Sequence, residues 1–108
     1  MKNSILISLL LFPFFINAQL VSRLEIYNIE TNQRQVFYEE STHFEAPNWS
    51  RDGQYLVINS LGKLYRIDIS DPQKTLIDTD FADKCNNDHG ISPDGKQLVI
   101  SHYDNPSV

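Results

Sequence analysis

The sequence has little cysteine, little glycine and no concentration of basic charge. Cys85 is the single cysteine among 108 residues, so an intrachain disulfide is excluded and stability has to come from packing. Nine basic residues stand against fourteen acidic ones, which gives a net charge of −5, and the Lys and Arg residues form no cluster. Such a chain would repel a nucleic-acid backbone, so nucleic acid is excluded as a partner.

Familiar catalytic motifs are also absent from the sequence. It contains no G-x-S-x-G, H-E-x-x-H, C-x-x-C or glycine-rich phosphate loop, so we favour a non-enzymatic protein without a cofactor. Residues 78–89 begin with acidic spacing like that of a calcium loop, but Asp83 stands where glycine is needed and His89 where glutamate is needed. We interpret this run as a solvated acidic connection rather than a metal site, and Cys85 as an inert rather than a reactive thiol.

The chain begins with a leader. Lys2 precedes an apolar run over residues 5–16, and Ala18 offers a small residue for cleavage. We predict a signal peptide over residues 1–18 and a periplasmic or secreted protein. The run is shorter than the roughly 20 apolar residues of a transmembrane helix, so an uncleaved anchor is the less favoured alternative. We expect no membrane span in the mature chain.

Two stretches of the chain repeat each other. When Ser50 is aligned with Ser92, at an offset of 42 residues, six of nine consecutive positions match. Leu24 aligns with Leu64 in a second pair of similar segments, at an offset of 40. A unit of roughly 40 to 45 residues is the length of a four-stranded propeller blade, although some helical repeats share it.

The elements of the repeat have the patterns of strands. SRDG and SPDG are turn sequences, because Asp bonds back to the backbone and Gly takes the left-handed conformation that closes a hairpin. The following segments, QYLVINS and KQLVIS, are apolar on both faces, which is typical of buried strands. KLYRIDI alternates, as a strand nearer the rim would. Further strands are expected over residues 22–29, 33–40 and 74–78, so we predict an all-β fold.

The stretches APNWSRDGQYLVINSLGKLYRIDI and NNDHGISPDGKQLVIS resemble the WD-like beta-propeller repeat of TolB-like periplasmic proteins. The shared signature is P-x-W-S-x-D-G, an aliphatic strand and then L-Y-x-I-D, and the resemblance covers Arg23 to the end. It implies a beta-propeller of four-stranded antiparallel blades. About two blades are present, which makes an incomplete ring, since closed propellers need four to eight. We expect Trp49 in the core between blades rather than in a ligand platform.

The resemblance also implies a domain organisation. Residues 19–108 would be the N-terminal part of a TolB-like propeller domain, with the remaining blades of the same polypeptide beyond Val108. The two strands expected before residue 41 match the outer strands of a blade whose inner strands come from the far end of the chain. A full TolB protein has a small domain before its propeller, whereas Leu20 leads straight into a strand. We expect the fragment not to fold stably alone.

The candidate site is a polar cluster at the start of the innermost strands, which open on the central channel of a propeller. Pro47 stands at the position aligned with His89 and offers no ligand group, so we favour His89 for the channel, with Asp88 pointing to the other side. The alternative is that the polar side chains satisfy loop backbone groups and His89 caps the strand. The predicted ligand-binding residues at the channel mouth are His89, Asp88, Asn87, Asn86, Glu45 and Asn48.

Two classes of function remain open at this stage. We favour an exported, non-enzymatic, transport-associated scaffold that binds a protein or envelope component, because the sequence holds no constellation of nucleophile and base. The alternative is a propeller hydrolase or lyase, or the propeller domain of a peptidase, that uses channel histidines and a metal. Further channel histidines from other blades would favour the alternative.

Overall fold

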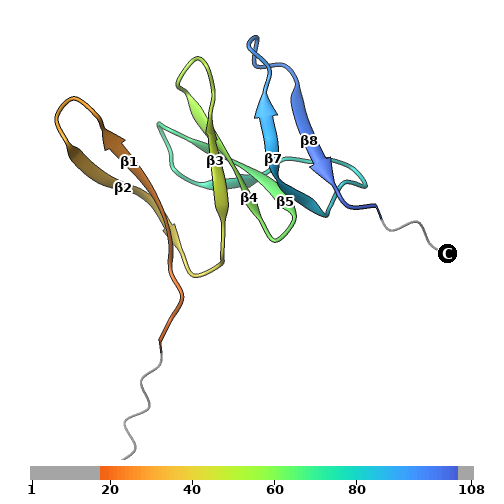
Figure 1. Ribbon diagram of the computed structural model, residues 1–108, viewed down its shortest axis with the longest axis horizontal. Coiled ribbons are helices and arrows are strands. Elements are labelled where there is room, and N and C mark those ends of the chain that lie inside the picture. Colours follow the sequence, from red (N-terminus) through yellow and green to blue (C-terminus); the bar gives the residue numbers. More distant parts are fainter. Residues whose placement is uncertain (1–17, 105–108) are drawn as a thin grey trace, which may run out of the picture.

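The computed structural model describes residues 18–104, and every regular element in that range is a β-strand. The strands form three antiparallel sheets that follow one another in chain order (Figure 1). The predicted all-β fold is confirmed, and the described residues include no helix capable of crossing a membrane. The signal peptide predicted over residues 1–18 lies, apart from Ala18, outside the described residues. The strands are β1 Ser22–Asn28, β2 Gln33–Glu40, β3 Glu45–Trp49, β4 Tyr55–Ser60, β5 Lys63–Asp68, β6 Lys74–Leu76, β7 Cys85–Ile91 and β8 Leu98–His102.

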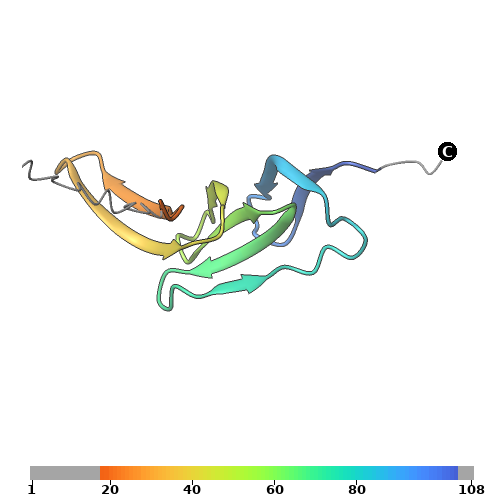
Figure 2. The same cartoon turned by 90° about the horizontal axis from the view of Figure 1, so that it is seen from below.

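The middle sheet has four strands in the order β3-β4-β5-β6, with each strand antiparallel to the next. This is the strand number and connectivity of a propeller blade. Figure 2 shows β6 on the far side of β5 from β4, at the outer edge of the sheet. The first sheet pairs β1 with β2, and the third pairs β7 with β8. The sequence therefore predicted the strands correctly, although β6 ends two residues earlier than expected.

The two repeated turns have the same hydrogen bonds. In the first, the Ser50 hydroxyl donates to Asp52 Oδ1 over 2.7 Å and accepts from the Tyr55 amide over 3.0 Å. In the second, the Ser92 hydroxyl donates to Asp94 Oδ1 over 2.6 Å and accepts from the Gln97 amide over 2.9 Å. The glycine that follows each aspartate has a φ of +73°, which glycine adopts without strain. The hydrogen bonds from the two serine hydroxyls, followed by those from the Gln54 and Lys96 amides, lower the pKa of both aspartates.

Two apolar clusters lie on opposite faces of the middle sheet. The cluster toward the first sheet includes Ile58 and Ile67, and the cluster toward the third sheet includes Val57 and Leu64. Each of these four side chains is at most 1% exposed, and burying one contributes roughly 1.5 to 3 kcal/mol. Leu64 shares a face of β5 with Arg66 and Asp68, as the alternation of KLYRIDI predicted. It is buried because Ala82 and Cys85, in the connection to the third sheet, belong to the same cluster.

A half-buried ion pair joins the first and middle sheets. Lys74 Nζ lies 2.6 Å and 2.8 Å from the two carboxylate oxygens of Glu40, and it also lies over the Tyr65 ring. The Tyr38 hydroxyl donates to the same carboxylate over 3.1 Å. Burial, together with this bond, raises the pKa of Tyr38 to about 12. The outer strands β2 and β6 are thus linked by an ion pair.

Trp49 is an exception to the sequence-based expectations. We expected it in the core between blades, but its side chain is 52% exposed within the described residues, so this prediction was wrong. Trp49 pairs with Leu56 at the end of β3, where the first sheet diverges from the middle sheet (Figure 1). The apolar cluster on this face closes around Leu24 and Phe44 and does not include Trp49.

Candidate binding site

The middle and third sheets meet at two ends, and each end holds a cavity. The repeated turns form one end, at the top of Figure 1. At the opposite end lie the start of β3, the β4–β5 turn and the start of β7. A cavity of about 230 Å³ lies among these three segments, and we call it the amide cavity. Its lining residues are His43, Glu45, Asn59, Leu61, Gly62, Cys85, Asn86 and Asn87.

Asn59 holds the amide cavity together. It is a polar residue that directly follows the apolar run Leu56–Ile58 of strand β4, and it is only 5% exposed. Its side-chain oxygen accepts a 3.2 Å hydrogen bond from the Gly62 amide in the next turn. Its side-chain nitrogen donates to Cys85 O over 3.0 Å and to Asn87 Oδ1 over 3.2 Å. One buried amide therefore fixes the β4–β5 turn to the start of β7, and a buried polar group with these partners is stable.

The β4–β5 turn approaches the third sheet closely. Leu61 and Gly62 have φ values of +52° and +82°, as the two central residues of a type I′ hairpin turn require. A Cβ atom at Gly62 would lie 2.7 Å from the carbonyl oxygen of Asp83, so only glycine fits there. The Cys85 amide donates to the Gly62 carbonyl over 2.8 Å. Leu61 is 77% exposed, so an apolar side chain stands at the rim of the cavity.

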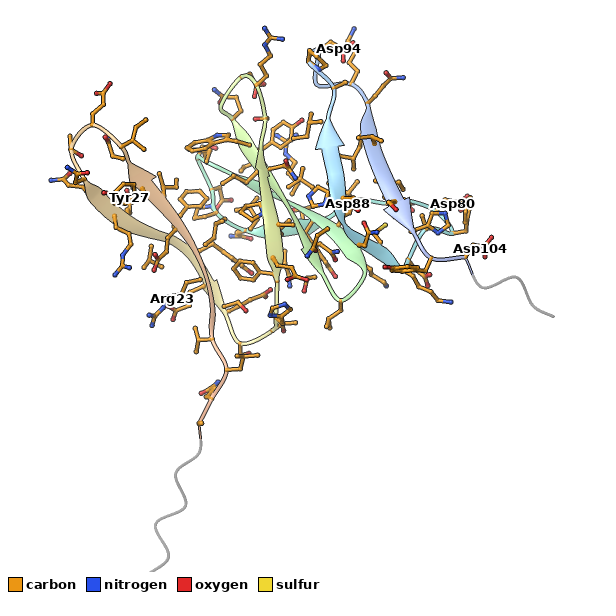
Figure 3. The ribbon with its side chains drawn as sticks, in the orientation of Figure 1. Arg23, Tyr27, Asp80, Asp88, Asp94 and Asp104 are labelled. Carbon is orange, nitrogen blue, oxygen red and sulfur yellow. The ribbon has the colours of Figure 1, made fainter. Side chains whose placement is uncertain are left out.

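The structure brings three of the six predicted site residues to this cavity. Glu45 reaches it from β3, and Asn86 and Asn87 reach it from β7. The Asn86 side chain is also tied to its own sheet, because its nitrogen donates to Ser101 Oγ and its oxygen accepts from the Asp88 amide. Asp88 is exposed and lies on β7 away from the turn that carries Asp94 (Figure 3).

The other two predicted residues meet at the joint between the sheets rather than in the cavity. Asn48 Nδ2 donates to the backbone oxygen of His89 over 3.0 Å, which ties β3 to β7. The His89 side chain is 8% exposed, and neither of its ring nitrogens has a hydrogen-bond partner among the described residues. Its ligand-binding role stays a prediction, and an imidazole without partners is an unusual group to bury.

Glu45 supplies the charge of the amide cavity. Its carboxylate lies 3.4 Å from Nε2 of His43, and both side chains are about half exposed. No Lys or Arg contributes to the lining, so the cavity offers one carboxylate and several amide groups. The Cys85 thiol lies at the inner wall and donates to the Ala82 carbonyl, and burial raises its pKa. A raised pKa favours the protonated thiol and agrees with the inert role expected for Cys85.

The acidic run at residues 78–89 shows no metal geometry. Asp78 Oδ1 accepts from the Asp80 amide and Thr79 donates to the Ala82 carbonyl, which are bonds within a turn. Nowhere in residues 18–104 do three His, Cys, Asp or Glu side chains converge in a way that could hold a metal ion.

The larger cavity lies at the turn end and was not predicted. It measures about 630 Å³ and is lined by residues of the two Asp-Gly turns and by Arg66 and Asp68 of β5. The Arg66 guanidinium lies 3.9 Å from the centre of the Tyr55 ring and is paired with Asp68. The alternation of KLYRIDI placed Arg66 and Asp68 on one face, but their proximity to the next sheet depends on how the sheets pack.

Comparison with known proteins gives two close similarities. No family model matches the chain. An uncharacterized protein of Agrobacterium fabrum (strain C58) is 53% identical over 81 residues, which are 74% of this chain and 28% of that protein. A solved structure from Agrobacterium tumefaciens, provisionally named TolB, matches with a TM-score of 0.71 at 53% identity and covers 72% of this chain and 28% of that one. The chain thus spans 28% of the length of both relatives, and over that span it is similar in sequence and fold to a TolB-type protein.

Proposed function

We propose that the protein is an exported, non-enzymatic scaffold of the TolB type that binds a protein or envelope component through the amide cavity. The leader at residues 1–18 supports export. The similarity to a structure provisionally named TolB supports the type of protein. The scaffold presents a binding surface at the joint between consecutive sheets, and a propeller fold for the whole protein would repeat such joints around a ring.

The convergence of three separate segments on one cavity is the observation that carries this proposal. Glu45, Asn59 and Asn87 come from three different strands. Glu45 is the register partner of Asn59 on the adjacent strand, and the Asn59 side chain bonds to Asn87. Polar groups that are fixed in advance bind a partner without the entropic cost of ordering them. A cavity that combines such polar groups with apolar surface has the composition of a recognition site.

Site-specific photocrosslinking in the native host tests the proposal. Leu61 is replaced by benzoylphenylalanine in one strain, and Gln54, which is exposed at the turn end, is replaced in a matched control strain. We expect an envelope protein to be crosslinked from position 61 and not from position 54. The protein identified by mass spectrometry is then purified, and its affinity for the scaffold is measured by calorimetry.

Two outcomes would contradict the proposal. One is crosslinking that is absent from position 61 or equal at both positions. The other is hydrolysis or elimination of an envelope polymer by the purified protein, which would favour the hydrolase or lyase class instead.

A further inference from the structure

The amide cavity has the chemistry of an acceptor for positive charge. Glu45 brings a carboxylate that is half exposed and lies 3.4 Å from Nε2 of His43. The Asn87 side-chain oxygen accepts one bond from Asn59, and a carbonyl-type oxygen has a second lone pair. Because no Lys or Arg lines the cavity, a cationic group would compete for Glu45 with the His43 imidazole but with no permanently charged lining residue.

Leu61 adds an apolar surface beside this charge, at a conformational cost. A left-handed backbone at a non-glycine residue is disfavoured, and Asn or Asp is the usual choice in such a turn. Leu61 nevertheless has a φ of +52° and is 77% exposed at the rim. An exposed leucine stabilises this turn no better than asparagine would. Its apolar side chain is therefore available for a contact outside the chain.

The size of the cavity limits what can enter it. Sites for whole small molecules measure about 300 to 1,000 Å³, and the amide cavity measures about 230 Å³. A single long side chain is a better match for it. Lys and Arg combine a charged head with an apolar stem, which corresponds to Glu45 inside the cavity and Leu61 at its rim.

We infer that the amide cavity binds a lysine or arginine side chain of a protein partner. The head group pairs with Glu45 and hydrogen-bonds to the Asn87 side-chain oxygen, and the stem lies on Leu61. This inference rests on the proposed function, because it takes the partner to be a protein. It adds the chemical class of the group that is recognised.

Matched tripeptides test the charge requirement in the intact, purified protein. The probes are acetyl-Gly-Lys-Gly-amide and acetyl-Gly-norleucine-Gly-amide, which share the stem and differ in the ammonium group. Binding is followed by the NMR shifts of the Leu61 methyl groups and the Asn87 side-chain amide. We expect the lysine peptide to bind about fivefold more tightly at low salt, since a partly exposed ion pair contributes up to that factor. The preference should shrink in 0.5 M salt.

Three variants separate a binding role from a structural one. Glu45→Gln should abolish the preference for lysine, whereas Glu30→Gln removes the same charge from the exposed β1–β2 turn and should not change it. Leu61→Asn suits the left-handed turn, so it should keep or raise stability while weakening both peptides. A merely structural leucine would show no loss of binding.

The outcomes distinguish this inference from the proposed function. Equal affinities for the two peptides, or an unchanged preference in Glu45→Gln, overturn the inference, while crosslinking from position 61 would still support the proposed function. Tighter binding of free cadaverine than of the lysine peptide assigns the cavity to a small diamine and also overturns the inference. If no crosslinking occurs from position 61, the proposed function is overturned. The inference that the cationic group belongs to a protein partner is then overturned as well.

Discussion

The two ends of the joint between the middle and third sheets differ in how they are built. At the turn end, both repeats carry the same Ser, Asp and Gly, and the same hydrogen bonds close each turn. At the other end, β3 begins with Glu-Ala-Pro and β7 with Cys-Asn-Asn, and the β4–β5 turn fills the space between them. Repetition therefore marks what each hairpin needs in order to fold. The departures from repetition mark where the two sheets make different contacts at their joint.

Gly62→Ala should have the largest effect, because it breaks the close approach at the amide cavity. Its Cβ would lie 2.7 Å from a backbone oxygen, at a φ of +82°. We expect the free energy of unfolding to fall by about 3 kcal/mol. Urea unfolding, followed by Trp49 fluorescence, measures the change.

Gly53→Ala is the matched control at the turn end. Gly53 has a φ of +73°, but a Cβ there would meet nothing within 4 Å. The expected loss is about 1 kcal/mol, from the backbone conformation alone. Equal losses at positions 53 and 62 would show that the contact with Asp83 is unimportant.

Asn59→Leu should have the next largest effect. The substitution leaves the Gly62 amide and the Cys85 carbonyl without the side chain that bonds them. We expect the free energy of unfolding to fall by about 2 kcal/mol, together with loss of peptide binding at the amide cavity. Asn86→Ala, which removes bonds within the third sheet only, should cost about 0.5 kcal/mol. If Asn59→Leu retains both stability and binding, the Asn59 amide does not hold the β4–β5 turn to the start of β7.

The two repeats also differ at the position of His89, where the first repeat has Pro47. Because His89 is 8% exposed, His89→Ala should leave a void and lower the free energy of unfolding by about 1.5 kcal/mol. His89→Leu fills the space and replaces two nitrogens without partners, so its stability should equal or exceed that of the wild type. If His89→Leu is as unstable as His89→Ala, the imidazole has a partner of its own. Differential scanning calorimetry compares the three proteins.

The smallest effects are expected at the turn end, in acid. Hydrogen bonds from Ser50 and Ser92 first, and then from backbone amides, lower the pKa values of Asp52 and Asp94 from their usual value of 3.8. Below pH 3.8 the unfolded chain binds more protons than the folded one, so stability falls as the pH falls through the lowered pKa values. Asp52→Asn and Asp94→Asn should each remove part of this dependence, and to a similar extent. Unfolding midpoints between pH 2 and 5 test this, and unequal effects would argue against equivalence of the repeats.

The sequence was most informative where the determining interactions are local. The hydrogen bonds of the Ser-x-Asp-Gly turns span at most five residues, so the structure of these turns could be predicted from the sequence alone. Glu45, Asn86 and Asn87 were predicted as neighbours because the repeat aligned the starts of two strands.

The rest of the cavity could not be predicted, because it depends on how the sheets pack. His43, Asn59 and Leu61 approach the start of β7 from segments that are distant in sequence. Asn59 carried one overlooked signal, since an asparagine inside the apolar run LVINS needs partners if it is buried. The exposure of Trp49 could not be predicted either, because it also depends on how the first and middle sheets pack at the end of β3.

Asn59 makes the amide cavity a point of thermodynamic linkage between the two sheets. The same side chain bonds the β4–β5 turn of one sheet and the first residues of the next. A group held in the cavity touches both sheets, and it is bound only while they remain aligned. Its occupancy therefore stabilises the alignment by RT ln(1 + [L]/Kd), about 2.7 kcal/mol at a concentration one hundred times the Kd. A partner that binds here would also act as a clamp that makes the joint between two repeats rigid.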